Sequence, residues 1–193
     1  MRRETSIEPA YFEAMYQGDR DPWGFETSPY EAAKYARTLA ALPGARFAHA
    51  LEVGCANGVL TAQLGPLCDD LLAIDVSGTA LDAARARCAE QSHIRFEKRQ
   101  LPQDAPDERF DVVLLSEVVY YFDRADVDRL AAYLTRALRS GGHLLLVHWI
   151  GETDYPLSGD EAVAALQAAL GPAVVPVHAE RRDRYRLDLW QRR

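Results

Sequence analysis

The stretch LEVGCANG, residues Leu51–Gly58, decides the fold, because an apolar run passes directly into a turn with glycine at Gly54 and Gly58. Glycine at Gly54 lets the chain turn sharply out of a strand, and Gly58 lets a ligand or the next helix approach the backbone closely. A dinucleotide-binding loop that started at Gly54 would also carry glycine at the positions of Ala56 and Val59. The sequence therefore disfavours an NAD-dependent oxidoreductase and predicts a loop for a thinner, nucleoside-like ligand.

A second apolar run, LLAID, ends in the acidic residue Asp75. An acidic side chain at the tip of the second strand accepts hydrogen bonds from free ribose hydroxyls. Together, the glycine loop and this acidic tip resemble motifs I and II of the class I methyltransferases. The resemblance implies S-adenosylmethionine as the cofactor.

Composition restricts the class of protein and its partners. A chain of 193 residues with 48% hydrophobic residues fits one domain with a sizeable core. A net charge of -7 argues against a face that neutralises phosphates, so we expect no nucleic-acid partner. The basic stretch ERRDRYR, from Glu180, is interrupted by acids and predicts a solvated turn.

The sequence also predicts a cytoplasmic protein with no membrane partner. No apolar stretch approaches the roughly 20 residues that cross a bilayer, and no signal-peptide core is present near the N-terminus. The three cysteines, Cys55, Cys68 and Cys88, lack C-x-x-C spacing and clustered histidines. We therefore expect reduced thiols and no metal site.

The chain is expected to form a single methyltransferase domain, 1–193, with a helical and aromatic N-terminal lid segment at 1–44 and a cofactor-binding α/β core at 45–193. Within the lid segment, DRDPWGFETS predicts a loop. The capping box SPYE that follows, Ser28 to Glu31, predicts a helix from Pro29 to about Leu42.

From Ala50 onward, apolar runs alternate with helical periods, as in successive β-α units. Helices are predicted to begin at Ser77, at Asp126 and at the capping box of Ser158 with Glu161. Further strands are predicted around Phe96, from Phe110 and over His143–Trp149, and the last two are Val174–Arg181 and Arg184–Arg193. Too little chain separates the last two strands for a helical crossover, so they are expected to pair as a hairpin. The predicted fold class is α/β: a Rossmann-like class I methyltransferase fold whose doubly wound, mostly parallel sheet ends in a C-terminal antiparallel hairpin.

Ligands of doubly wound sheets bind outside the carboxyl ends of the strands, where the strand order reverses. If the strands at Leu51 and Phe110 flank that point, the glycine loop faces SEVVYYF across one crevice. Ser116 and Glu117 then lie beside the loop, and His148 and Trp149 lie one strand further out.

Methyl transfer to an amine requires alignment, exclusion of water and the removal of one proton. An amine must be neutral to attack, and Glu117 or His148 is a candidate catalytic group that could supply the base. Their places at the strand tips favour His148 as base or acceptor-orienting group, and Glu117 as binder of an amine proton or support for the methionine end of the cofactor. Structural alternatives stay open: Glu117 as a cap of the next turn, His148 as a core histidine, and Tyr120 and Tyr121 as packing residues, one of them lining the pocket. Glu52 is expected to order the loop rather than to perform chemistry.

Three longer segments, DPWGFETSPYEAAKY from Asp21, LSEVVYYF from Leu115 and LLLVHWIGETDYPLSGDE from Leu144, resemble the nodulation protein S family. The resemblance implies an N-methyltransferase of the free amino group of a deacetylated chitin oligosaccharide. The cofactor-binding residues expected from motifs and resemblance are Tyr30, Glu52, Gly54, Cys55, Ala56, Asn57, Gly58, Asp75, Val76, Gln100, Leu101 and Ser116. The residues expected to line the substrate or lid are Trp23, Lys34, Tyr120, Tyr121 and Trp149. One departure concerns the third strand tip, where Gln100 replaces the acid that many class I members place near the adenine amino group.

The function expected from all this is S-adenosylmethionine-dependent N-methylation of a small amine, by resemblance an amino sugar. Two alternatives stay open: an O-methyltransferase of a small hydroxylated metabolite, and a cofactor-binding partner protein without turnover. The sequence does not specify the oligomeric state.

Overall fold

The computed structural model describes residues 2–44 and 46–193, so the predicted boundary at residue 45 lies outside the described residues. The described chain forms two compact units. The first is Glu8–Gln100, and the second joins the residues up to Ile7 to Leu101–Arg193. The single methyltransferase domain over 1–193 stays a prediction.

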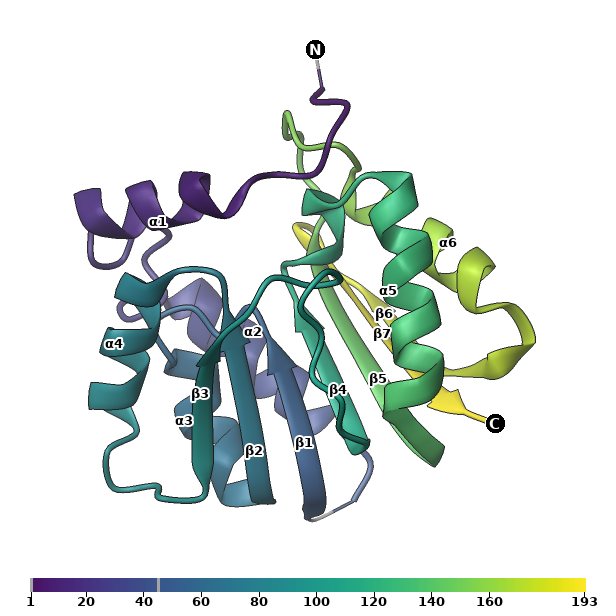
Figure 1. Cartoon of the computed structure of the whole chain (residues 1–193), viewed down its shortest axis with the longest axis horizontal. Helices are drawn as coiled ribbons and strands as arrows, with labels where there is room; N and C mark the ends of the chain where they lie inside the picture. The colour runs from purple at the N-terminus through teal and green to yellow at the C-terminus, as the bar shows by residue number, and fades with distance from the viewer. Residues whose placement is uncertain (1, 45) are drawn as a thin grey trace. The chain divides into compact units, whose positions relative to one another are not determined.

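The first unit carries a parallel sheet in the order β3-β2-β1, whose arrows point the same way in Figure 1. Its strands are β1 (Phe47–Val53), β2 (Cys68–Asp75) and β3 (Ile94–Lys98). Its helices are α1 (Pro9–Gly18), α2 (Pro29–Ala40), α3 (Val59–Leu64) and α4 (Gly78–Arg87), with a short 3-10 turn at Gly65–Leu67. The predicted strand–loop–helix order around the glycine loop is confirmed.

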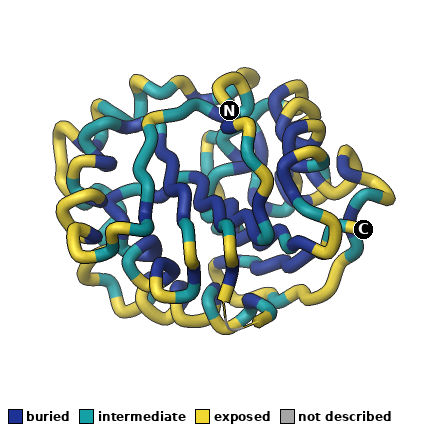
Figure 2. The backbone as a smooth tube through the Cα atoms, turned by 60° about the horizontal axis from the view of Figure 1, so that its bottom comes forward, coloured by how far each residue is buried: buried dark blue, intermediate teal, exposed yellow. Residues whose placement is uncertain are grey.

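Strands β1 and β2 become buried toward their carboxyl ends. The last residues of β1 and β2 are almost all buried, as expected for parallel strands covered on both faces. In Figure 2 the buried residues lie in inner stretches of the trace, and the exposed residues lie mainly in its outer turns. The register pairs Val53 with Ile74, so the glycine loop leaves β1 level with the end of β2 and with Asp75.

Local capping explains the helices of the first unit. Ser28 accepts the backbone N–H of Glu31 and starts α2 as predicted, although α2 ends at Ala40 rather than near Leu42. Helix α1 lies in the segment predicted to be helical and aromatic, but its bounds were not predicted. The Glu13 carboxylate accepts the Thr79 hydroxyl at 2.6 Å at the start of α4, and this hydrogen bond holds the pKa of Glu13 down at about 2.

The second unit carries a mixed sheet in the order β4-β5-β7-β6. Its strands are β4 (Phe110–Ser116), β5 (Leu138–Trp149), β6 (Val174–Arg181) and β7 (Tyr185–Arg192). Its helices are α5 (Arg124–Ala137) and α6 (Gly159–Leu170), which pack side by side (Figure 1), with 3-10 turns at Val119–Tyr121 and Gly171–Ala173. The predicted antiparallel pairing of the last two strands is confirmed.

Two predicted boundaries in the second unit were wrong. The cap of α5 is Asp123, which accepts the N–H of Asp126, so the helix begins at Arg124 and not at Asp126. Strand β5 begins at Leu138 rather than His143, because it pairs with β4 before and after a register shift. Gly142 lies in that irregular stretch, where an added Cβ would come 2.9 Å from the Asp111 carbonyl oxygen.

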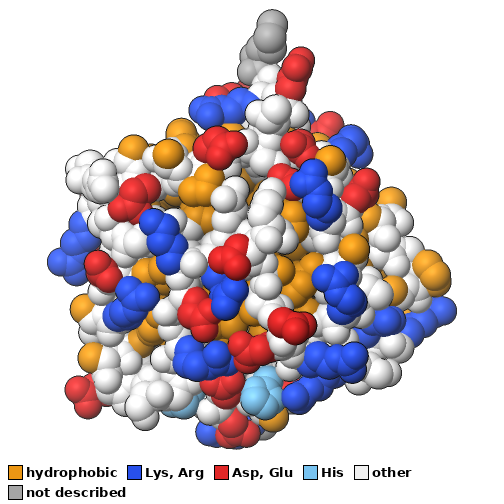
Figure 3. Space-filling view, in the orientation of Figure 1, with side chains coloured by type: hydrophobic (Ala, Val, Ile, Leu, Met, Phe, Trp, Pro, Cys, Tyr) orange, Lys and Arg blue, Asp and Glu red, His pale blue; other side chains and the backbone are white. Residues whose placement is uncertain are grey.

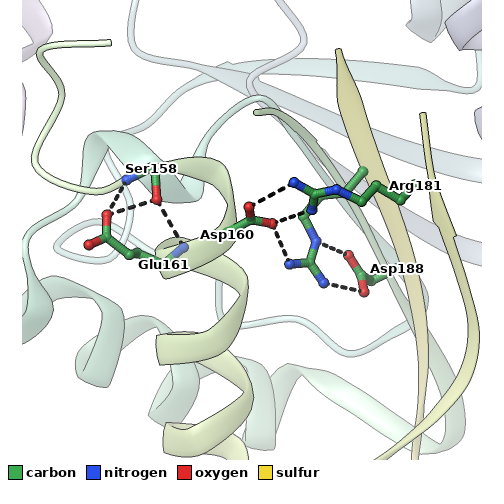
Figure 4. A network of polar contacts seen from close by, with 6 residues as sticks. Ser158, Asp160, Glu161, Arg181 and Asp188 are labelled. Atoms are coloured by element: carbon green, nitrogen blue, oxygen red, sulfur yellow. Dashed lines mark hydrogen bonds and ion pairs between the residues drawn. The ribbon is translucent and has the colours of Figure 1, made fainter. Parts of the chain in front are cut away.

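The C-terminal hairpin is fastened to α6 by a charged network (Figure 4). Asp160 accepts from Arg181 and from Arg186, and Arg186 makes a two-point contact with the buried Asp188. Only 23% of the Arg186 side chain is exposed. The prediction of a solvated turn was therefore wrong for Arg186. One acid that pairs with it, Asp160, is distant in sequence, and the other, Asp188, lies two residues further along the same strand.

Acidic and basic side chains are interspersed on the face drawn in Figure 3. Across residues 2–44 and 46–193, no three His, Cys, Asp or Glu side chains are grouped to hold a metal ion. The helices in this part of the chain are too short or too polar to span a bilayer.

Candidate functional site

The glycine loop, Gly54–Gly58, follows β1 and has three residues in the left-handed backbone region. Its φ angles are +75° at Gly54, +52° at Ala56 and +79° at Gly58. At Gly58 an added Cβ would lie 2.8 Å from the Cα of Ala84 on α4, so glycine is required there for close helix packing as well as for φ. Ala56 adopts a conformation that glycine would adopt more easily, so the loop keeps its shape through contacts with its surroundings.

Asp75 provides the main contact that holds this shape. Its carboxylate accepts the backbone N–H of Ala56 and that of Ser77, each at 2.9 Å. Asp75 is only 8% exposed, and burial raises its pKa despite these hydrogen bonds. The acidic strand tip and the glycine loop, which the sequence analysis expected to act together, are thus in direct contact.

Asn57 is fully buried in the glycine loop and carries both a satisfied and an unsatisfied polar atom. Its side-chain N–H₂ donates to Asp21 at 3.2 Å. Its Oδ1 is buried and meets no hydrogen-bond donor among the described residues. A buried acceptor of this kind costs free energy unless another molecule pairs with it.

Two further predicted residues of the first unit are buried beside the loop. Burial raises the pKa of Glu52 to about 8, so this carboxyl is mainly protonated at neutral pH. Burial also raises the pKa of the Cys55 thiol well above its usual value. A neutral thiol is a poor nucleophile, so Cys55 acts as a small loop residue in this structure.

The predicted lid residues of the first unit lie in a region of aromatic contacts. Trp23 stacks on Phe25, with ring centroids 5.7 Å apart. Lys34 is 3% exposed, forms an ion pair with Glu31 at 2.9 Å, and has its ammonium 5.5 Å from the centre of the Tyr30 ring. Val76 and Gln100 are partly exposed.

Glu117 is the central predicted residue of the second unit. It follows β4 with a φ of +58°, a left-handed conformation that is costly for a residue with a side chain. Its carboxylate oxygen Oε2 accepts the Tyr120 hydroxyl and the Trp149 backbone N–H, each at 2.7 Å. The predicted tips of β4 and β5 therefore converge on one carboxylate.

His148 has a different setting from the one its candidate role as base requires. It is fully buried, and its Nε2 accepts the backbone N–H of Val119 at 3.1 Å. That nitrogen therefore carries no proton here, and the ring orients the turn that follows Glu117. The Tyr120 ring packs edge-on against the imidazole, 5.3 Å between centroids.

Three tyrosines, Tyr120, Tyr121 and Tyr155, form what we call the tyrosine cluster. Tyr155 lies almost parallel to Tyr120 at 5.4 Å and edge-on to Tyr121 at 4.6 Å. Tyr120 is buried, whereas Tyr121 and Tyr155 are partly exposed. The predicted residues Ser116 and Trp149 are also partly exposed, and Leu101 is buried.

The structure thus assembles the predicted residues into two groups, one in each unit, and a crevice shared by both stays a prediction. Sequence patterns did not identify the partners of these groups, above all Arg87, Glu26 and Tyr155. Helical spacing gives one indication that Arg87 lies near the glycine loop. Arg87 follows Ala84 by three positions and shares its face of α4, and Ala84 packs against Gly58.

Known proteins resemble this chain in sequence and in fold. The family model described as nodulation protein S matches residues 16–149. A nodulation protein S from Rhizobium tropici is 38% identical over 65% of this chain and 53% of its own length. A ubiquinone biosynthesis O-methyltransferase from Rhodopseudomonas palustris is 33% identical over 52% of this chain and 37% of its own length. The chain spans about half the length of the curated nodulation relatives it matches first.

Among solved structures, the N-methyltransferase NodS from Bradyrhizobium japonicum WM9 in complex with S-adenosyl-L-homocysteine matches with a TM-score of 0.84. The match covers 96% of this chain and 99% of that one at 23% sequence identity. This likeness confirms the predicted Rossmann-like class I methyltransferase fold.

Proposed function

The chain belongs to the nodulation protein S family, and on that premise we propose that it is an S-adenosylmethionine-dependent N-methyltransferase of a small amine. The Glu8–Gln100 unit would hold the cofactor, and the Leu101–Arg193 unit would supply the groups that handle the acceptor. An amino sugar or deacetylated chitin oligosaccharide is the acceptor class we propose from the family resemblance.

The observation that carries the proposal is the contact between Asp75 and Ala56 at 2.9 Å. It joins an acidic strand tip to a glycine loop that lacks the glycines of a dinucleotide site. An acid at that tip suits a free ribose, and a loop of this kind suits a nucleoside without a pyrophosphate. Adenosyl sulfonium compounds carry a free ribose and lack a pyrophosphate, so they match both features.

The residues present fit S-adenosylmethionine. Gly58 keeps the backbone close to α4, Asp75 supplies carboxylate oxygens for the ribose, and the buried Oδ1 of Asn57 offers an acceptor for a cationic ammonium group. When bound, the cofactor would supply an activated methyl group on sulfur. The protein would then need only to align the acceptor, exclude water and manage one proton.

For the acceptor, we propose that Glu117 binds the amine N–H and takes up the proton that the amine loses. Two donors on Oε2 fix the direction of this carboxylate, so little reorganisation is needed when an amine arrives. We propose that His148 positions the turn after Glu117 and does not act as the base, because its Nε2 accepts the Val119 amide.

An O-methyltransferase of a small hydroxylated metabolite is the second candidate. The similarity to a ubiquinone biosynthesis O-methyltransferase supports it, because that relative is named as an enzyme that methylates oxygen. A hydroxyl must be deprotonated before attack, so this alternative predicts a rate that keeps rising to a higher pH than it would with the amine of an amino sugar.

One assay separates these functions. The chain is incubated with S-adenosylmethionine labelled in its methyl group and with a glucosamine oligomer, an N-acetylated oligomer and a catechol, and the products are analysed by mass spectrometry. We expect labelled N-methyl product only from the free amine. Labelled catechol alone would support O-methylation, and cofactor binding without any product would support a partner protein without turnover.

A further inference from the structure

A polar junction in the first unit connects the loop Asp19–Ser28 to the glycine loop, and we call its four residues the latch: Asp21, Glu26, Asn57 and Arg87. Asp21 shapes the loop from within, because its two carboxylate oxygens accept the backbone N–H groups of Phe25 and Glu26 at 2.8 and 2.9 Å. The same carboxylate accepts the Asn57 side chain at 3.2 Å. One acid thus sets both the form of the loop and its attachment.

Arg87 makes the second attachment from the end of α4. Its Nε donates to the backbone carbonyl of Asn57 at 2.9 Å, and its Nη2 forms an ion pair with Glu26. Glu26 also accepts weakly from the Asn57 side chain at 3.5 Å. The ion-paired side chains are about one quarter exposed, so solvent screens them only in part.

These contacts converge on Asn57, which the latch holds through its side chain and through its backbone carbonyl. Its neighbour Ala56 is held by Asp75, and its other neighbour is Gly58, packed on α4. A displacement of the Asp19–Ser28 loop would therefore be transmitted to the residues proposed to seat the cofactor. The same loop carries Trp23, which packs edge-on against Tyr16 at 5.5 Å.

We propose that Glu26 and Arg87 are positioning residues for cofactor binding, which act through Asn57 by holding the aromatic loop and the glycine loop in one arrangement. This inference rests on the proposed function. A bound cofactor and an ordered Asp19–Ser28 loop would stabilise each other, since each restricts the same Asn57.

The variants R87A and E26Q, and the double variant, test this coupling in the 193-residue chain. Arg85 offers a matched control, because it lies on the same helix and contacts Asp82 and the Phe96 carbonyl instead of the latch. Affinity for S-adenosylhomocysteine is measured by titration calorimetry. Hydrogen exchange of the 19–28 peptide is followed with and without that compound.

We expect R87A to weaken the affinity by about tenfold, the loss typical of one charge-assisted contact, and E26Q by somewhat less. The double variant should bind about as well as R87A alone, because both changes remove one shared interaction. The control R85A should stay within about twofold of the unchanged protein. The compound should slow exchange of the 19–28 peptide in the unchanged protein and in R85A, but not in R87A.

Equal affinities of R87A, E26Q and the unchanged protein would overturn the inference alone. If the unchanged protein does not bind S-adenosylhomocysteine, the proposed function falls, and this inference falls with it. If R87A does not fold, the affinity of E26Q for S-adenosylhomocysteine tests the inference. This substitution keeps the shape of the side chain and leaves Arg87 its bond to the Asn57 carbonyl. Comparable melting temperatures of E26Q and the unchanged protein separate a positioning role from a general loss of stability.

Discussion

The Asp75 carboxylate accepts the backbone N–H of Ala56 at 2.9 Å, so the end of β2 determines the path of a loop that follows β1. Ala56 has a φ of +52°, which an alanine adopts only when its surroundings require it. A second hydrogen bond, from Ser77, holds the carboxylate in place. The residue proposed to bind the ribose is therefore also the residue that shapes the proposed cofactor loop.

The substitution D75N should weaken binding of S-adenosylhomocysteine by at least about tenfold, because an amide offers one acceptor oxygen where the carboxylate offers two. Titration calorimetry provides the measurement. D69N is the matched control, since Asp69 lies at the opposite end of the same strand, is largely exposed and pairs with Arg46. An unchanged affinity in D75N would remove Asp75 from the proposed site.

The buried Glu52 predicts a pH dependence of stability. Its pKa is raised from 4.5 to about 8, so between these values the unfolded chain is ionised while the folded protein keeps the proton. Stability from this residue is therefore fully present below pH 4.5 and falls by about 1.4 kcal/mol per pH unit until the pH passes about 8. By pH 7 the loss is of order 3 kcal/mol.

E52Q should remove this dependence, so its free energy of unfolding should fall less steeply than that of the unchanged protein between pH 5 and pH 8. Urea titrations at several pH values measure the difference. E90Q, on an exposed residue, controls for the removal of a carboxyl group. Parallel pH profiles for E52Q and the unchanged protein would show that Glu52 is ionised in the folded state.

Gly58 should tolerate alanine poorly, because the added methyl group meets Ala84 at 2.8 Å and the backbone has a φ of +79°. We expect G58A to lower the free energy of unfolding by about 2–4 kcal/mol. Gly141 isolates the backbone contribution, since its φ is +78° and an added Cβ would meet nothing within 4 Å. G141A should cost only about 1 kcal/mol, and equal losses in thermal or urea unfolding would refute the packing argument.

Tyr120 should affect turnover through Glu117 and leave cofactor binding unchanged. Y120F removes one of the two donors to the carboxylate, so we expect kcat for an amine acceptor to fall by about tenfold and E117Q to reduce it further. The affinity for S-adenosylhomocysteine should stay the same in both variants. Y133F, which removes the same group from a buried tyrosine of α5, serves as the control. Normal kcat in E117Q would exclude Glu117 from proton removal.

Local signals in the sequence were sufficient for much of the fold. Ser28 and Ser158 cap α2 and α6 because their hydroxyls bond to backbone amides only three residues away. The apolar runs that end before Gly54 and at Asp75 form buried strands, as their own composition indicates. The final hairpin follows from the short connection between its strands. Such signals need no knowledge of distant contacts.

The remaining features depend on partners far apart in the chain. Strand β5 starts at Leu138 because β4 pairs with that residue, which its own periodicity does not indicate. The latch joins Glu26 to Arg87, and Glu117 adopts its unusual φ where Tyr120 and Trp149 donate to it. Motifs located the residues of the two groups, but the hydrogen bonds that fix their geometry required the folded structure.

Titration calorimetry with S-adenosylhomocysteine on the folded 193-residue chain tests the central claim most directly. We predict binding of one molecule per chain, accompanied by a rise in melting temperature. In D75N both the affinity and this rise should be smaller, whereas D69N should match the unchanged protein. No heat of binding and no change in melting temperature, with protein shown to be folded by circular dichroism, would contradict the account.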